Sequence, residues 1–242
     1  MPLLKSFVRA HTTKGFFEVI RQANSEWRIY RLHCRGLKKL RPLLQRSEKK
    51  LNLGCGPNCK SGWINIDLFD SRADVQLDLR ERWPFDDAAV SYIYSEHAFE
   101  HFEPHEEAAH LLTEAQRVLR PGGAFDVGVP DTEWPLRAYA NPSDPYWTFA
   151  KTVHPSWCVT QLDHLNYHFR QRTEHKYAWD YETLARKLNE FGFTDIARRE
   201  YDPALDSESR KIGTLYVIAR KPLHDVPEPD TSAEMNGELA AR

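Results

Sequence analysis

In the stretch Lys50-Leu51-Asn52-Leu53-Gly54-Cys55-Gly56, a short apolar run ends in a Gly-x-Gly turn. Glycine has no Cβ, so such a turn after a strand lets the backbone approach a ligand closely. The next apolar run, 63–67, ends in Asp67. A carboxylate at that place can accept hydrogen bonds from both ribose hydroxyls of a nucleoside. Together these features predict a nucleoside-binding site at the carboxyl edge of a parallel sheet.

The glycine turn departs from the fingerprint of dinucleotide-binding proteins. That fingerprint is G-x-G-x-x-G at the start of a helix. Here Cys59 stands where the third glycine belongs. This departure argues against a bound pyrophosphate, although a nicotinamide-dependent oxidoreductase stays open as an alternative.

Apolar runs and turn signals predict an α/β fold with a Rossmann-like sheet. We expect strands at 50–53, 63–67, 73–77, 90–95, 124–129, 193–199 and 215–220, the last two as an antiparallel pair. Apolar residues at helical spacing predict helices over 105–119 and 180–191, which end before Arg-Pro-Gly-Gly and at Gly192. Strands that alternate with helices are typical of a mostly parallel sheet.

The chain divides into a basic N-terminal extension, one main domain and a tail. Residues 1–49 predict one or two helices with an excess of about ten positive charges. Such a helix either packs on the domain with a solvated basic face or lies on an anionic membrane or nucleic acid. Residues 50–221 form the domain, within which 131–178 are irregular and aromatic and are expected to cap the pocket. Residues 222–242 are expected to be a loose acidic tail.

Cysteine usage and hydropathy indicate a cytoplasmic protein. The four cysteines lack the second pair that a zinc site of the C-x-x-C type needs, and we expect free thiols in a reducing compartment. No run reaches the roughly 20 apolar residues of a membrane span, and the N-terminus lacks the features of a secretory signal.

The candidate catalytic groups are His97, His101 and Asp131, which follow the strands expected at 90–95 and 124–129. Histidine titrates in the range that suits a general base. His97 and His101 can also be structural, and Asp131 can reach the pocket from the strand end. Four further histidines lie in the expected cap, but their spacing matches no simple ligand motif, so we expect no metal site.

The order of the motifs resembles that of class I methyltransferases that use S-adenosylmethionine (SAM), in particular the small bacterial type 11-like domains. The motifs that carry the resemblance are Leu51-Asn52-Leu53-Gly54-Cys55-Gly56, Asn65-Ile66-Asp67, Leu77-Asp78-Leu79, Trp83-Pro84-Phe85-Asp86-Asp87, Ser95-Glu96-His97-Ala98-Phe99-Glu100-His101 and Arg117-Val118-Leu119-Arg120-Pro121-Gly122-Gly123. Asn52 stands where the family often has an acid, and Asn58 where it has a third glycine.

The resemblance implies a seven-stranded sheet with its last strand antiparallel and helices on both faces. It also implies cofactor contacts to methionine and ribose at the glycine turn, to the ribose hydroxyls at Asp67 and to adenine near Asp78. The full set of cofactor residues expected from it is Asn52, Gly54, Cys55, Gly56, Asp67, Leu68, Asp78, Leu79 and Ser95.

We therefore expect a SAM-dependent methyltransferase that acts on a hydroxyl or amine of a small-molecule or glycan-linked acceptor. Alternatives are a non-catalytic interaction protein with this fold and the oxidoreductase named above. The basic N-terminal helix can contact a membrane or a partner, and the sequence holds no specific nucleic-acid motif.

Overall fold

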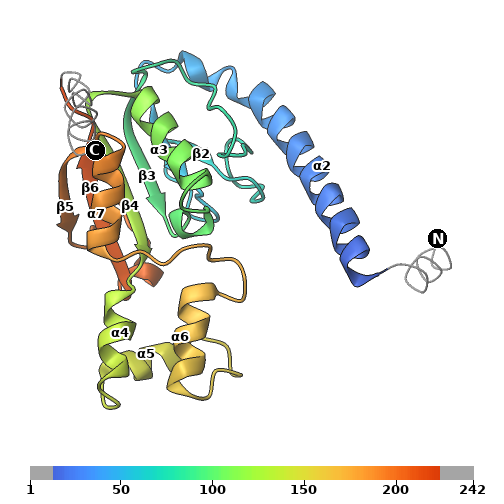
Figure 1. Cartoon of the computed structure of the whole chain (residues 1–242). Helices are drawn as coiled ribbons and strands as arrows, with labels where there is room; N and C mark the ends of the chain where they lie inside the picture. Colours follow the sequence, from blue (N-terminus) through green and yellow to red (C-terminus); the bar gives the residue numbers. More distant parts are fainter. Residues whose placement is uncertain (1–12, 224–242) are drawn as a thin grey trace, which may run out of the picture.

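A computed structural model of the chain describes residues 13–223 (Figure 1). Most of the expected tail, and the first part of the N-terminal extension, lie outside this range. None of the helices in the described part has the length and apolar character needed to cross a membrane.

Six strands form one mixed sheet. They are β1 (Lys50–Leu53), β2 (Ile64–Ile66), β3 (Val90–Glu96), β4 (Leu119–Pro130), β5 (Thr194–Arg199) and β6 (Thr214–Arg220). Their order is β2-β1-β3-β4-β6-β5, with β1 to β4 parallel and β6 antiparallel to both neighbours. The predicted α/β class and the antiparallel last strand are confirmed.

The sheet has six strands and not the seven expected, because residues 73–77 form no strand. Only Val75 pairs, through an isolated bridge to Ile66. The Asp74 carboxylate accepts the amide hydrogen of Asn65 at 2.8 Å. A side chain therefore occupies the donor that a longer backbone ladder would use, and pairing stops after one bridge.

Helices cover one face of the sheet. α3 (Glu107–Val118) and α7 (Tyr181–Glu190) lie on this face (Figure 1). Their buried side chains share one apolar core with strand residues such as Leu53, Ile93 and Val127. Each strand presents alternate residues to this face, which is the period that a half-apolar strand requires.

Loops meet the opposite face, so the expectation of helices on both faces is wrong for the described residues. The connection from β1 to β2 is too short for a helix and contains Pro57. The strands present polar and aromatic residues to this side. Tyr94 donates to Asp206 at 2.8 Å, and Arg199 pairs with Asp126 at 2.9 Å. Partners of this kind satisfy polar groups that no apolar helix could cover.

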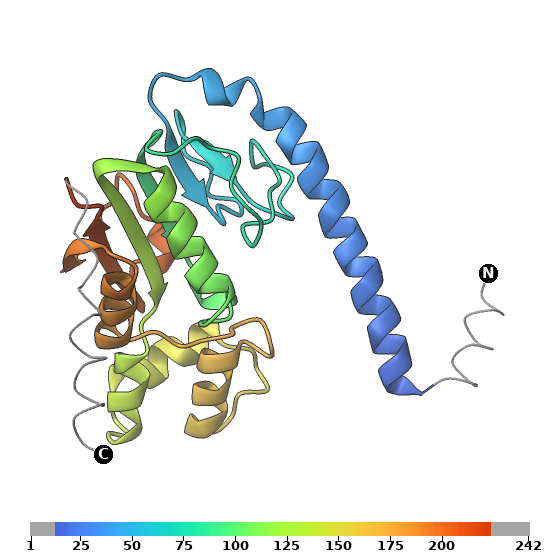
Figure 2. The same ribbon diagram turned by 45° about the horizontal axis from the view of Figure 1, so that its top comes forward.

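The N-terminal helix α2 (Lys14–Leu40) begins at a Thr13 cap and ends before Pro42. The C-terminal part of α2 contacts the domain, beginning with the ion pair between Glu26 and Arg80. A Cβ at Gly36 would lie 1.9 Å from the Gln76 carbonyl oxygen, so glycine is what allows the helix to seat there. Figure 2 shows the rest of α2 extending away from the sheet.

Residues 131–178 form three short helices where we expected irregular structure. These are α4 (Glu133–Tyr139), α5 (Pro145–Val153) and α6 (Gln161–Arg170). Local signals set their starts: Asp144 caps α5 ahead of Pro145, and Thr160 forms a capping box with Asp163. They share a small apolar core of their own, which includes Tyr146, Trp147 and Leu165.

Candidate active site

The glycine turn lies at the carboxyl end of β1, and both glycines have a positive φ, +62° at Gly54 and +47° at Gly56. A Cβ at Gly54 would lie 2.3 Å from the Cβ of Ala98. Glycine is therefore needed at Gly54 for packing within the protein and not for contact with a ligand. A Cβ at Gly56 would meet nothing within 4 Å. Gly56 therefore presents bare backbone to open space.

The Asp67 carboxylate lies directly beside this turn. It accepts hydrogen bonds from the backbone amides of Gly56 at 2.9 Å and of Phe69 and Asp70 at 2.8 Å. These amides hold the carboxylate in one orientation. Each carboxylate oxygen has two acceptor sites, so room for a hydroxyl donor remains.

Other residues expected at the cofactor are buried. Asn52 is 2% exposed, and its side-chain amide donates to the Asn58 carbonyl at 3.0 Å and to the Asn65 side chain at 2.9 Å. Its observed contacts thus hold the glycine loop. Cys55 is buried, and the pKa of its thiol is raised by burial first and then by the neighbouring Cys59. Leu68 is partly buried next to Asp67.

Ser95 lies at the end of β3, 1% exposed, and its hydroxyl has no hydrogen-bond partner within the described residues. An unpartnered buried hydroxyl costs free energy unless another group binds it. The position follows the register of β1 and β3, in which Ser95 pairs with Leu53 next to the glycine turn.

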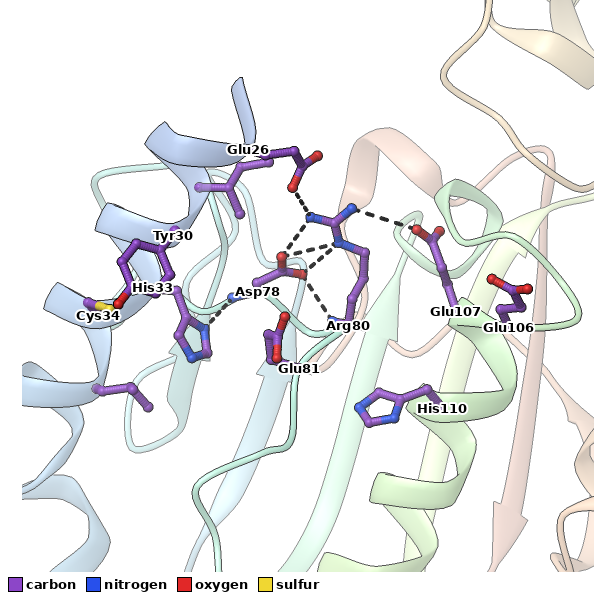
Figure 3. Close-up of a pocket in the computed structure, with 12 residues that line it drawn as sticks. Glu26, Tyr30, His33, Cys34, Asp78, Arg80, Glu81, Glu106, Glu107 and His110 are labelled. Carbon is purple, nitrogen blue, oxygen red and sulfur yellow. Dashed lines mark hydrogen bonds and ion pairs between the residues drawn. The ribbon is translucent and has the colours of Figure 1, made fainter. Parts of the chain in front are cut away.

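Asp78 lies in the wall of a cavity of about 710 Å³ between α2 and the start of α3 (Figure 3). This volume falls in the range of small-molecule sites, roughly 300–1,000 Å³. The Asp78 carboxylate is held by Arg80, with Nη2 to Oδ2 at 2.7 Å. Burial would raise the pKa of Asp78, but the hydrogen bonds and charge of Arg80 outweigh it and hold that pKa below its usual value. Leu79 is buried behind it.

His97 follows β3 with a left-handed backbone, φ +53°, which is rare for a residue other than glycine. Its Nε2 lies 2.8 Å from the Thr214 hydroxyl, and that hydroxyl donates to the Arg210 carbonyl at 2.6 Å. Thr214 must then accept from His97, which leaves the Nδ1 of His97 with a lone pair. Burial, and then the charge of Arg210, lower the pKa of His97 well below its usual value. His97 is therefore neutral near pH 7.

Glu100 and His101 belong to the short 3₁₀ helix η2 (Phe99–His101). Burial raises the pKa of Glu100 to about 8. The Nε2 of His101 lies 3.9 Å from the Oε1 of Glu100. The Nε2 of His175, which lies between α6 and α7, is also 3.9 Å from this oxygen.

Asp131 follows β4 and starts the segment of α4 to α6. Its carboxylate accepts the Glu133 amide at 2.9 Å, and its own amide donates to the Gly213 carbonyl at 2.9 Å. Its observed contacts thus orient the chain at the exit of β4.

Comparison with known proteins decides the class. Residues 51–127 match the sequence model of a family described as a methyltransferase domain. This part of the chain is a methyltransferase domain. The match begins at β1 and covers the glycine turn, Asp67, His97 and Glu100. It favours the methyltransferase over the oxidoreductase, and SAM is the cofactor of this domain.

Solved structures of methyltransferases are similar to this domain at low identity. The phosphoethanolamine N-methyltransferase 2 of Haemonchus contortus, solved with SAM, is 13% identical to this chain, with a TM-score of 0.46. The alignment includes 76% of this chain and 52% of that protein. A SAM-dependent methyltransferase of Archaeoglobus fulgidus is 18% identical, with a TM-score of 0.45 and coverages of 76% and 91%. The chain also spans 49% of the CurJ carbon methyltransferase, at 15% identity and a TM-score of 0.42. No curated protein matches the chain.

The residues of the methyltransferase domain fit the cofactor. A Cβ at Gly56 would meet no atom within 4 Å, and backbone amides orient the Asp67 carboxylate beside it. The buried Ser95 hydroxyl has no hydrogen-bond partner among the described residues. Sequence reasoning missed Thr214 and Arg210, which fix the tautomer and charge of His97. They lie more than a hundred residues further along the chain, and only the β4–β6 pairing brings them to the carboxyl end of β3.

Proposed function

We propose that this methyltransferase transfers the methyl group of SAM to a hydroxyl or amine of a small-molecule or glycan-linked acceptor. The observation that carries the proposal is the contact between Gly56 and Asp67, which joins bare backbone and an oriented carboxylate at one strand edge. Backbone and carboxylate at that place suit the ribose of a nucleoside cofactor. SAM supplies an activated methyl group, so the chain's main task is to hold donor and acceptor in line.

A hydroxyl acceptor must also lose a proton, and His97 is the best placed group to accept it. The Thr214 hydroxyl accepts from Nε2, so Nδ1 presents its lone pair, and the low pKa of His97 keeps that lone pair available near pH 7. Its unusual backbone conformation suits a residue held for function, because such strain persists only where the surroundings impose it.

The helices α4 to α6 offer an aromatic surface for the acceptor. Tyr139 and Trp157 are about half exposed there, at 50% and 51%. Exposed rings with a polar edge suit ligands that combine apolar and hydroxyl surface, as sugars do. This composition supports a glycan-linked acceptor that is selected by residues 131–178.

The test is methyl transfer from radiolabelled SAM to a cell extract separated into glycan, lipid, small-molecule and protein fractions. We expect label in the glycan or small-molecule fraction. His97→Asn should lose most transfer while it still binds S-adenosylhomocysteine, because asparagine tolerates a positive φ but supplies no base. The proposal fails if no fraction takes up label, or if the label enters protein alone.

We also propose that α2 lies on an anionic membrane surface. Phe16, Ile20 and Trp27 are 51%, 40% and 61% exposed and share one side of the helix by their spacing. The neighbouring side carries Arg21 and Arg28, seven residues apart. An apolar stripe with aromatic residues beside a basic stripe is typical of helices that lie in a membrane interface.

Co-sedimentation with lipid vesicles tests this second proposal. We expect binding to vesicles that contain phosphatidylserine and little binding to pure phosphatidylcholine. Trp27→Glu should weaken binding, whereas Trp157→Glu, which changes another exposed tryptophan in the link between α5 and α6, should not. Equal binding to both vesicle types, or equal loss in both variants, would exclude α2 as the contact.

A further inference from the structure

Three side chains from two distant parts of the chain converge beside the end of β3. Glu100 and His101 come from η2, and His175 comes from the link between α6 and α7. One ligand atom from each lies within 4.8 Å of the others. Methyl transfer as proposed above uses none of the three.

Glu100 is the unusual member of this group. Its side chain is buried, at 1% exposure, and neither carboxylate oxygen has a hydrogen-bond partner within the described residues. A buried carboxylate without a partner is costly, and buried charges in proteins are normally paired or bind a metal. Among the described residues, no positive group lies within hydrogen-bond distance of the Glu100 carboxylate.

The two histidines point their lone pairs at the same oxygen. The Nδ1 of His101 lies 3.0 Å from the Glu174 carbonyl oxygen, and the Nδ1 of His175 lies 3.0 Å from that of His168. A carbonyl can only accept, so both Nδ1 atoms carry the hydrogen and both Nε2 atoms are unprotonated in the neutral rings. Each Nε2 lies 3.9 Å from the Oε1 of Glu100. Histidines that bind metals are held in this way, by a hydrogen bond from the second ring nitrogen.

We propose that Glu100, His101 and His175 bind one divalent transition-metal ion, for which zinc is the best match. Imidazole nitrogens favour transition metals over magnesium or calcium, which prefer oxygen ligands alone. Metal bonds of roughly 2.0–2.1 Å place ligand atoms somewhat over 3 Å apart, so the observed 3.9 Å needs only a small contraction. Three protein ligands leave one position open, as in catalytic zinc sites.

A small cavity lies beside two of the three side chains. It has a volume of about 10 Å³, the space of one water molecule, and it is lined by Glu100 and His175 but not by His101. The Nδ1 of His97 lies 3.8 Å from the same Glu100 oxygen, so a third imidazole borders the site. A bound ion would tie the link that follows α6 to the end of β3, and it would place a positive charge next to His97.

Cobalt and zinc binding to the full-length protein test this site. We expect one equivalent of cobalt to give the intense visible absorption of a four-coordinate site, and zinc to displace it. His175→Gln should weaken cobalt binding by at least about 100-fold, since it removes a ligand. The matched control is His105→Gln, which changes an exposed histidine close to η2. Binding of S-adenosylhomocysteine by each variant serves as the check that it is folded.

A second histidine cluster gives the decisive comparison. His154, Cys158 and His164 also lie within ligand distance of one another, inside the segment of α4 to α6. If His164→Gln removes cobalt binding and His175→Gln does not, the ion belongs to that cluster and the proposal is overturned. A wild-type protein that folds and binds S-adenosylhomocysteine but takes up no cobalt would overturn it too. Glu100→Gln is expected to lose the ion while it keeps or gains stability in the metal-free state, because it removes a buried carboxylate.

Discussion

The amide of Gly56 donates a hydrogen bond of 2.9 Å to the carboxylate of Asp67, which joins the turn after β1 to the end of β2. Neighbouring parallel strands bring these two positions together, since Leu53 pairs with Ile66. The contact holds the carboxylate beside exposed backbone, where the proposed cofactor site would take the ribose.

The two glycines of the turn should respond differently to alanine. Gly54→Ala places a Cβ 2.3 Å from that of Ala98 at a positive φ, so we expect a loss of about 3 kcal/mol in the free energy of unfolding. Gly56→Ala adds only the backbone strain, about 1 kcal/mol. Denaturant unfolding measures both. In Gly56→Ala the added methyl group would occupy the space proposed for the cofactor. The affinity of this variant for S-adenosylhomocysteine should therefore fall at least about tenfold. Unchanged affinity would place the cofactor elsewhere.

Gly36 should control whether α2 seats on the domain. A Cβ there would lie 1.9 Å from the Gln76 backbone, so Gly36→Ala should displace the helix. Gly15→Ala is the matched control, because a Cβ at Gly15 meets nothing within 4 Å. We expect faster hydrogen exchange over residues 29–40 and 75–79 in Gly36→Ala alone. Equal exchange in both variants would contradict the seating.

Arg80 should be more important for stability than its position near the surface suggests. It pairs with the buried Asp78 at 2.7 Å and with Glu26 of α2 at 3.1 Å. Arg80→Met would leave the Asp78 carboxylate buried without its partner, at a cost of roughly 2 kcal/mol after allowance for solvent. The pKa of Asp78 should rise, because Arg80 no longer opposes the effect of burial. Chemical denaturation checks the first effect, with the exposed Arg82→Met as the control that should change little.

The segment of α4 to α6 should lose stability in mild acid. Burial first, and then the charge of neighbouring histidines, lower the pKa of both His154 and His168 to about 4, against an ordinary value of 6.5. Between pH 6.5 and 4 the unfolded chain therefore binds more protons than the folded one, so stability falls as the pH falls through this window. We expect of order 1 kcal/mol per histidine, since solvent screens part of the effect.

Thermal unfolding followed by tryptophan fluorescence at pH 7.5, 6 and 5 measures this dependence. His154→Gln should make the dependence shallower, whereas His105→Gln should leave it as steep as in the wild type. A melting temperature that rises toward pH 5 would show that these histidines are not buried as neutral rings.

Sequence reasoning reached the edge of the sheet because the signals there are local. Apolar runs that stop at glycine or aspartate define β1 and β2, and parallel strands place their ends side by side. The same reasoning failed at Val75, where a side chain of Asp74 replaces the backbone ladder. It also missed α5 and α6, whose apolar periods are too short to stand out between prolines.

The convergence of His101 and His175 could not be predicted from their order in the chain. They are separated by β4 and four helices, α3 to α6, and their contact depends on how the link after α6 returns to η2. The sequence did indicate that the sheet face opposite α3 is not covered by helices, because Tyr92, Tyr94 and Asp126 alternate with apolar residues. A strand buried by helices on both sides would be apolar at every position.

The central claim is that Gly56 and Asp67 hold the adenosyl cofactor, and titration calorimetry with S-adenosylhomocysteine tests it most directly. We predict that the wild type binds one equivalent and that Asp67→Asn binds roughly 10–100-fold more weakly, because hydrogen bonds to the charged carboxylate are lost. Asp70→Asn, which changes a carboxylate paired only with Arg72, should bind like the wild type. Equal affinity in all three proteins, or no binding by the wild type, would contradict the account.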